Sequence, residues 1–415
     1  MREMKDSGLK WLGEIPSNWT LAKIGGLYSI RNEKVSDKEY PPLSVTNKGI
    51  LPQLETAAKT NDGDNRKLVR AGDFAINSRS DRRGSCGISP YDGSVSLINI
   101  VMVPRKEMMP TYYEWLFHTT QFGDENYRWG HGIVDDLWTT GWQDMKKITI
   151  PMPSLDEQRR IADYLDAKCA EIDALAADIQ AQIDTLEQYK RSVITEAVTK
   201  GLNPDAEMKD SGIQWIGMMP SHWDCIRGKY ILQYLQKPIR EEDGVITCFR
   251  DGEVTLRSNR REDGFTMADK EIGYQGIDVG DLVVHGMDGF AGAIGISDSR
   301  GKASPVLNVL DTKQNKRYIM YFLRSMAYSD VFLALATGIR VRSCDLRWNK
   351  LAELFYPIPP IEEQNLIVAH IDTALHKANN VISEKKDQLE TLEAYKKSLI
   401  YEYVTGKKEV PVIAD

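Results

Sequence analysis

The chain has 415 residues, of which 42% are hydrophobic and 27% are charged, and its formal net charge is −7 at pH 7. This length allows about two to four domains, and the composition is typical of a globular protein. No run of about 18 apolar residues could span a membrane, and residues 1–10 lack the apolar stretch of a secretory signal. We therefore expect a cytoplasmic protein with no membrane partner.

The sequence carries no motif of a metal site or of a common catalytic centre. The cysteine count is odd and no C-x-x-C pair occurs, which argues against a zinc cluster or a disulfide framework: Cys86, Cys169, Cys225, Cys248 and Cys344. No G-x-x-x-x-G-K-[ST], G-x-G-x-x-G or [ND]-P-P-[YF] string occurs. The carboxylates of Asp205 and Glu207 superficially resemble a nuclease motif but lie too close together in the chain. We expect no catalytic site and no cofactor in this chain.

The chain is an internal repeat. MKDSGLKWLGEIPSNW at residues 4–19 recurs as MKDSGIQWIGMMPSHW at residues 208–223, and a block at 151–200 recurs at 357–406. Two unlike segments lie between these blocks, so two copies of the same repeated blocks flank two different variable sequences. The predicted organisation is a repeat motif (1–19), a variable region (20–150), a helical region (151–203), a second motif (204–223), a second variable region (224–356), a second helical region (357–406) and a tail (407–415).

Each variable region mixes short strand and helix signals. Residues 95–103 and 281–296 favour strands, whereas residues 111–119 and 317–328 favour short helices. The triplets at 72–74 and 280–282, Gly-Asp-Phe and Gly-Asp-Leu, predict equivalent turns before equivalent strands. We expect two small α/β domains of similar fold, and therefore an α+β protein overall.

Each helical region predicts one long helix, because residues 155–200 and 361–405 contain neither glycine nor proline. Ser154 and Glu157 form a candidate capping box at the first helix start, where the second copy has Pro360. Gly201 and Gly406 mark the two ends. The acidic pairs at 156–157 and 362–363 are interpreted as favouring the helix dipole.

Apolar residues with alternating spacings of four and three predict that the two helices pair as an antiparallel coiled coil. The first seam is Leu165, Cys169, Ile172, Ala176, Ile179, Ile183, Leu186, Lys190, Val193 and Ala197. The second seam is Ile371, Leu375, Ala378, Ile382, Lys385, Leu389, Leu392, Lys396, Leu399 and Tyr403. Such helices are about 65–70 Å long at 1.5 Å per residue, which would hold the variable regions apart. The open alternative is that they dimerise the protein or bind a partner.

The two predicted helices account for the net negative charge of the chain. Residues 155–200 carry a net −4 and residues 361–406 a net −3, whereas each variable region has one more basic than acidic residue. DNA binding needs a local cationic surface, so the overall charge is compatible with it. Candidate contacts in the first region are Asn47, Lys48, Arg79, Arg82, Arg83, Arg128 and His131. Those in the second are Arg250, Arg257, Arg260, Arg261, Arg340 and Arg342.

The whole arrangement resembles the specificity subunits of type I restriction-modification systems, the HsdS family. The resemblance rests on the P-x-P-[SP]-[LI]-[DE]-E-Q start of each helix, the L-E-x-Y-K-[RK]-S block and the motif heading each half. It implies that each variable region is a target recognition domain for one half of a split double-stranded DNA sequence. It also implies a helical spacer that docks two methyltransferase subunits and restriction subunits, which hold S-adenosylmethionine, ATP and magnesium.

Three other functions remain open. A fused restriction-methylation enzyme would need catalytic motifs that the sequence lacks. A stand-alone DNA-binding regulator would need tight, specific DNA binding without partners. A coiled-coil adaptor with no DNA role would tolerate replacement of the Arg257–Arg261 cluster by alanine.

Overall fold

The computed structural model describes residues 2–53, 63–79, 82–105, 107–132, 138–260, 272–334 and 346–411. The chain folds as two compact units, the first Met1–Ile179 with Lys386–Asp415, and the second Gln180–Lys385. Each unit holds one repeat motif, one variable region and part of both long helices. The contacts thus divide the chain within the helices, whereas the sequence pattern suggests divisions at their ends. In the described part of the chain, no helix has the length and apolar character needed to cross a membrane.

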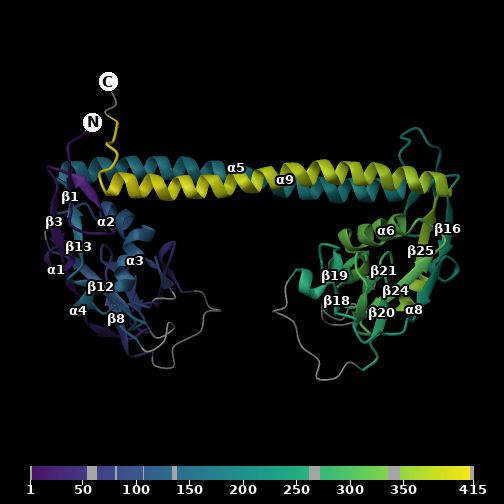
Figure 1. Cartoon of the computed structure of the whole chain (residues 1–415), viewed down its shortest axis with the longest axis horizontal. Coiled ribbons are helices and arrows are strands. Elements are labelled where there is room, and N and C mark those ends of the chain that lie inside the picture. The colour runs from purple at the N-terminus through teal and green to yellow at the C-terminus, as the bar shows by residue number, and fades with distance from the viewer. Residues whose placement is uncertain are drawn as a thin grey trace. The chain divides into compact units, whose positions relative to one another are not determined.

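The two long helices are α5 (Leu155–Lys200) and α9 (Ile361–Val404). In unit 1 the centroids of the tilted rings of Tyr164 and Tyr403 lie 4.6 Å apart, and Lys396 Nζ donates to Asp173 Oδ1 at 2.6 Å. The residue number falls along α9 as it rises along α5, so the helices pair in antiparallel fashion, side by side in Figure 1. This agrees with the predicted fold class.

Residues of the predicted seam form the buried faces of α5 and α9. Leu165, Cys169, Ile179 and Ile183 of α5 are buried, as are Ile371, Ala378, Ile382, Leu399 and Tyr403 of α9. Ala197 is buried as well. The remaining seam residues are half-buried: Ile172, Ala176, Leu186, Lys190, Val193, Leu375, Lys385, Leu389, Leu392 and Lys396. The three seam lysines therefore keep their ammonium groups at the edge of the seam, as long amphipathic side chains do.

The helix ends follow the sequence signals with one difference. Glu157 N–H donates to Ser154 Oγ at 3.3 Å, and the glycines after the helices, Gly201 and Gly406, have φ of +75° and +73°. The carboxylate of Glu157 does not complete a capping box. It accepts instead from Trp19 Nε1 at 2.8 Å, so the predicted box is half correct.

Unit 1 is built on small antiparallel sheets, the largest having the order β10-β9-β12-β4. Its strands are β1 (Met4–Asp6), β2 (Glu14–Pro16), β3 (Thr20–Lys23), β4 (Tyr28–Ile30), β5 (Lys34–Val35), β6 (Leu43–Thr46), β7 (Gly49–Pro52), β8 (Arg66–Val69), β9 (Phe74–Asn77), β10 (Cys86–Ile88), β11 (Gly93–Val95), β12 (Asn99–Pro104) and β13 (Thr149–Met152). Its short helices are α1 (Ile24–Leu27), α2 (Pro110–Phe117), α3 (Thr120–Arg128) and α4 (Trp142–Met145).

Unit 2 has the corresponding four-stranded sheet in the order β22-β21-β24-β17. Its strands are β14 (Met208–Asp210), β15 (Met218–Pro220), β16 (Asp224–Arg227), β17 (Leu232–Leu235), β18 (Ile246–Cys248), β19 (Val254–Leu256), β20 (Gln275–Ile277), β21 (Leu282–His285), β22 (Ile294–Ile296), β23 (Gly301–Ala303), β24 (Leu307–Thr312) and β25 (Phe355–Ile358). Its helices are α6 (Lys316–Tyr328), α7 (Val331–Ala334) and α8 (Trp348–Glu353), with single 3-10 turns at η3 (Gly228–Tyr230), η4 (Arg257–Asn259) and η5 (Gly289–Ala291).

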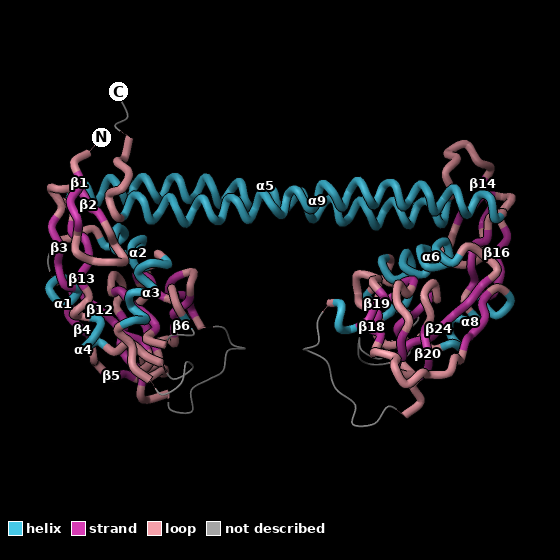
Figure 2. Tube along the Cα trace, in the orientation of Figure 1, coloured by secondary structure: helices cyan, strands magenta, loops and turns pink. Residues whose placement is uncertain are grey.

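The internal repeat extends into the variable regions. Besides the main sheet, the hairpin β6–β7 corresponds to β18–β19, the pair β8–β11 to β20–β23, and the pair β3–β13 to β16–β25. The expected turns are present, since Gly72 before β9 and Gly280 before β21 have φ of +89° and +86°. The tube view shows this mixture of strands and helices in each unit (Figure 2). Two similar folds therefore carry unlike side chains.

Each variable region is attached to the long helices through its own helix. The hydroxyl of Tyr112 on α2 donates to Val404 O at 2.8 Å in unit 1. In unit 2 the hydroxyl of the equivalent Tyr318 on α6 lies within hydrogen-bond distance of two carbonyl oxygens, Pro357 O at 2.8 Å and Val198 O at 3.2 Å. Both tyrosines are fully buried in the main hydrophobic cluster of their unit. Each variable region is thereby joined to the long helices through a buried contact.

Candidate nucleic-acid interface

Two loops of unit 1 carry five of its seven predicted DNA contacts, and the equivalent loops of unit 2 carry one of its six. In unit 1 the turn of the β6–β7 hairpin carries Asn47 and Lys48, and the loop after β9 begins at Arg79. In unit 2 the turn of the β18–β19 hairpin carries Arg250, and the loop after β21 carries Asp288. Because the strand orders match, these loops correspond although their lengths and side chains differ.

The loop after the central strand is fixed in the same way in both units. At the end of β9, Asn77 Oδ1 accepts from the backbone N–H of Arg79 at 3.0 Å. At the end of β21, His285 Nδ1 accepts from the backbone N–H of Met287 at 3.2 Å and of Asp288 at 3.0 Å. A side chain that satisfies the backbone of its own turn limits the loop's freedom. The side chains that follow are therefore held in defined positions.

In unit 1 the loop after β9 lies against α3 and the segment that follows it. The guanidinium of Arg83 stacks over the ring of Tyr127 at 4.1 Å and donates to Asp124 at 2.9 Å. Arg79 and His131 both form backbone bridges to Thr139. The structure thus brings these three predicted residues, which are 52 or fewer positions apart, to one end of unit 1.

The other unit 1 candidates are on exposed positions near these loops or on the hairpin tip. Arg128, at the end of α3, forms an ion pair with Glu125 at 2.8 Å and its side chain is 63% exposed. The backbone N–H of Arg82 donates to Arg79 O at 3.3 Å within the loop. Asn47 and Lys48 are exposed in their turn.

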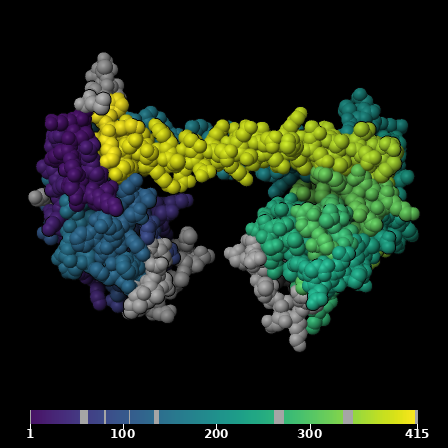
Figure 3. Space-filling view, viewed as in Figure 1, coloured from purple at the N-terminus to yellow at the C-terminus, as the bar shows by residue number. Residues whose placement is uncertain are grey.

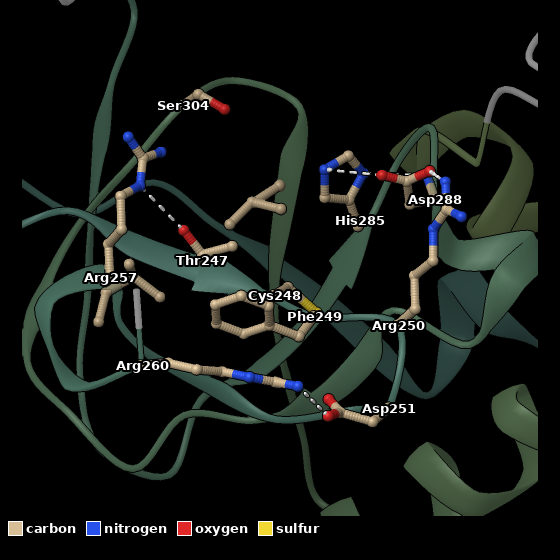
Figure 4. Close-up of a pocket in the computed structure, with 12 residues that line it drawn as sticks. Thr247, Cys248, Phe249, Arg250, Asp251, Arg257, Arg260, His285, Asp288 and Ser304 are labelled. Carbon is tan, nitrogen blue, oxygen red and sulfur yellow. Dashed lines mark hydrogen bonds and ion pairs between the residues drawn. The ribbon is translucent and has the colours of Figure 1, made fainter. Parts of the chain in front are cut away.

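In unit 2 three predicted arginines surround one cavity of about 650 Å³. Figure 4 shows Arg250, Arg257 and Arg260 around it, with His285 and Asp288 opposite Arg257. The hairpin β18–β19 contributes Arg250, η4 contributes Arg257, and Arg260 follows η4. The remaining candidates of this region, Arg261, Arg340 and Arg342, lie outside the described residues.

Each arginine of the cavity is held by a polar or aromatic partner. Arg250 Nη2 is 2.9 Å from Asp288 Oδ1, and Arg257 Nε donates to Thr247 Oγ1 at 3.4 Å. Arg260 lies 4.2 Å from the ring centroid of Phe249 and forms ion pairs with carboxylates of the neighbouring turn, Asp251 at 2.7 Å and Glu253 at 3.0 Å. These pairs are solvent-accessible, so an incoming anion or base can exchange with them at small cost.

The cavity offers both donors and acceptors to a ligand. Burial lowers the pKa of His285, so its ring is neutral at pH 7. Because Nδ1 accepts backbone bonds, the proton is on Nε2 and can be donated. Guanidinium donors and the Asp288 acceptor complete the set. Base edges in a DNA groove present such mixed patterns, whereas a purely phosphate-binding surface needs donors alone.

Sequence reasoning did not select the acceptors of this cavity. Asp288, Asp251 and Thr247 were not distinguishable from other surface residues, because their partners lie 38, 9 and 10 residues away. The sequence did offer one signal for the position of these loops. Asn77 and His285 end the equivalent strands β9 and β21, which follow the predicted Gly-Asp turns.

The described residues contain no group of three or more His, Cys, Asp or Glu side chains placed to hold a metal ion. Among the cysteines, Cys86, Cys169 and Cys248 are buried. Burial raises the pKa of the Cys169 thiol to about 11, consistent with a seam residue. Cys344 lies outside the described residues.

Comparison with known proteins gives one consistent family. The family model "Type I restriction modification DNA specificity domain" matches residues 16–185. The putative type I restriction enzyme MjaX specificity subunit of Methanocaldococcus jannaschii is 21% identical over 96% of this chain and 96% of its own length. The type I restriction enzyme EcoDI specificity subunit of Escherichia coli is 20% identical over 89% of this chain and 86% of its own.

Solved structures agree on the fold. A chain from a study of complex assembly and conformational transition of the type I R-M system has a TM-score of 0.67 and 15% identity, covering 95% of this chain and 99% of its own. The HsdS subunit from Thermoanaerobacter tengcongensis has a TM-score of 0.50 and 15% identity, covering 97% of this chain and all of its own. Residues 16–185 therefore match the type I restriction modification DNA specificity domain, and over most of its length the chain is similar to specificity subunits of type I restriction enzymes.

Proposed function

We propose that this chain reads a split DNA sequence for a type I restriction-modification complex, with one half-site for each variable region. The observation that carries the proposal is the repetition of one fold with different loop side chains. Equivalent hairpin turns present Lys48 in unit 1 and Arg250 in unit 2, and the equivalent strand ends are Asn77 and His285. Two similar scaffolds with unlike reading residues suit two unlike half-sites.

The test is to map DNA methylation directed by the chain. We would co-express it with its methyltransferase subunit and locate methylated adenines by single-molecule sequencing. A chimera in which residues 224–356 come from another specificity subunit is the matched control. The expected result is one split motif for the parent chain, of which only one half changes in the chimera. A stable complex that methylates nothing, or a chimera that changes both halves, would contradict the proposal.

We further propose that the long helices dock two copies of the same methyltransferase subunit. Four exposed apolar residues each lie one position before a seam residue and recur at a spacing of 206: Leu175 with Val381, and Tyr189 with Tyr395. In antiparallel helices such positions flank the seam on one side. Unit 1 therefore has Leu175 with Tyr395, and unit 2 has Val381 with Tyr189. Equivalent apolar patches suit identical partners.

The proposal gives the chain a recognition role without catalysis of its own. Methyl transfer would use S-adenosylmethionine in the methyltransferase subunits, and the restriction subunits would use ATP and magnesium. The chain would act in the cytoplasm, where its double-stranded DNA target lies. Methylation by the chain alone with added S-adenosylmethionine would overturn this division of roles.

A further inference from the structure

A second cavity of unit 2, of about 570 Å³, lies between the long helices and the variable region. It is lined by Lys190 and Arg191 of α5, by Arg324 and Tyr328 of α6, and by residues around η5. Arg250 and Asp251 line this cavity and also the cavity of Figure 4. The two cavities therefore share a wall, and the surface continues from the candidate half-site reader to helix α5.

Two guanidinium groups share one aromatic ring in this second cavity. Arg191 lies 5.3 Å from the ring centroid of Tyr328, and Arg324 lies 5.7 Å from the same centroid. Arg324 is further fixed, because its Nε donates to the Tyr328 hydroxyl at 2.8 Å and its Nη2 donates to Asp251 O at 2.7 Å. The ring attracts both cations but does not neutralise either.

The other cations that line the cavity have acidic partners. Lys190 pairs with Glu187 at 3.0 Å, and Arg250 pairs with Asp288 at 2.9 Å. Among the residues the structure describes, neither Arg191 nor Arg324 has a carboxylate partner. Two uncompensated like charges at one ring repel each other, and an anion between them would remove that repulsion.

We propose that Arg191 and Arg324 form a clamp for a phosphate of the DNA backbone, next to the half-site that unit 2 reads. The inference rests on the proposed function and adds helix α5 to the DNA-binding surface. Guanidinium groups bind phosphate oxygens through paired N–H donors, which suits two arginines facing one site. The net −4 of α5 does not oppose this, because a phosphate within the site responds mainly to the nearest charges.

Three carboxylates line the cavity: Glu187 is paired with Lys190 and Asp251 with Arg260, whereas Asp330 opposes an anion. Asp330 lines the same space and has no ion-pair partner among the described residues. It would repel a bound phosphate, so its replacement by asparagine gives a variant with the opposite expected effect. A site that instead accepted a basic segment of a partner protein would be weakened by the same replacement.

Unit 1 has no equivalent clamp in its described residues, which supplies a control. The α9 residue equivalent to Arg191 is Lys397, which pairs with Glu393 at 2.6 Å. The helix equivalent to α6 ends at Phe117, and the position equivalent to Arg324 is His118. Lys397→Ala thus removes a cation from the matching helix position without removing an uncompensated charge.

The test measures DNA affinity of the complex of the full chain with its methyltransferase subunits, by fluorescence anisotropy over a range of salt concentrations. We expect Arg191→Ala and Arg324→Ala each to weaken binding about tenfold. Each should lower the slope of log K against log salt by about 0.9, equally for target and non-target duplexes. Asp330→Asn should tighten binding, Lys397→Ala should change little, and the methylated motif should stay the same.

Three results would overturn the clamp. Unchanged affinity and salt slope in both arginine variants, with parent-like target binding, would reject it and leave the proposed function intact. A loss of methyltransferase assembly in these variants would assign the cavity to a protein partner. A weaker binding of Asp330→Asn would do the same. If the unaltered complex binds no DNA, the proposed DNA-recognition function itself is wrong. This result differs from rejection of the clamp, in which the unaltered complex still binds its target.

Discussion

The indole N–H of Trp19 donates to Glu157 Oε2 at 2.8 Å, and this bond joins the repeat motif of unit 1 to the first turn of α5. Unit 2 repeats it, since Trp223 Nε1 donates to Glu363 Oε1 at 3.1 Å. The second carboxylate oxygen differs between the copies: it accepts from Arg2 in unit 1 and lies 2.8 Å from His222 Nε2 in unit 2. The most strongly repeated motif therefore fixes the start of each long helix.

Removing this carboxylate should destabilise unit 1. Trp19 is 1% exposed, so Glu157→Ala leaves its buried N–H unsatisfied, at a cost of about 1–3 kcal/mol. Urea denaturation followed by tryptophan fluorescence should show an earlier transition. Asp156→Ala is the matched control, because that neighbouring side chain is 90% exposed. Equal effects of the two substitutions would mean that the acidic pair acts only on the helix dipole.

Periodic features were predictable from the sequence, whereas the pairings between distant residues were not. The seam of α5 and α9 follows from regular apolar spacing, which depends only on neighbours along one helix. The capping residue Ser154 follows from local rules for the same reason. The destination of the Glu157 carboxylate is a residue 138 positions away, which no local pattern contains. The common recurrence of Trp and Glu in both copies was the one available signal.

The candidate site was predictable by residue type and not by arrangement. The arginine-rich segments of the sequence supplied Arg250, Arg257 and Arg260, which do line one cavity. Their acidic partners and the two arginines at Tyr328 come from elements that meet only in the tertiary fold. The dipole interpretation for Glu157 and Glu363 missed their buried bonds to tryptophan.

Arg250 and Asp288 should determine part of one half-site. Arg250→Ala removes a donor set suited to guanine, and Asp288→Asn removes its carboxylate partner while keeping the shape. Loss of one base contact costs about 1–3 kcal/mol of discrimination, so methylation should spread to sites with changes at one position of one half. The control is Arg227→Ala. The Arg227 guanidinium lies 2.7 Å from the Glu353 carboxylate, and neither residue lines the cavity. Methylome sequencing gives the answer: a motif relaxed in both halves, or in neither, would contradict the assignment.

Asp278 should make the stability of unit 2 depend on acid pH. Lys237 at 2.8 Å and Arg300 at 2.6 Å lower its pKa to about 2, below the usual 3.8. Between these values the unfolded chain binds more protons than the folded chain, so this contribution to stability is present above about pH 4 and is lost as the pH falls toward 2. Denaturation midpoints of the parent and Asp278→Asn should therefore differ above pH 4 and converge as the pH falls toward 2. The exposed Asp298→Asn serves as control, and a difference independent of pH would reject the charge-based explanation.

The repeated apolar patches should each hold one methyltransferase subunit. In unit 1, Leu175 and Tyr395 are 49% and 54% exposed, and in unit 2, Val381 and Tyr189 are 39% and 51% exposed. Replacing both residues of one patch by serine removes apolar contact area without disturbing the seam, so native mass spectrometry should detect one bound subunit in place of two.

Circular dichroism should show unchanged helix content in these double variants, because the substituted residues lie outside the seam. Tyr91→Ser removes a side chain that is 42% exposed and lies in the loop between β10 and β11, and it should leave both subunits bound. Loss of both subunits from a single-patch variant would mean that the partners bind only as a pair. Retention of both would place their docking surface elsewhere on the chain, since an exposed apolar patch that contributes no binding energy is not an interface.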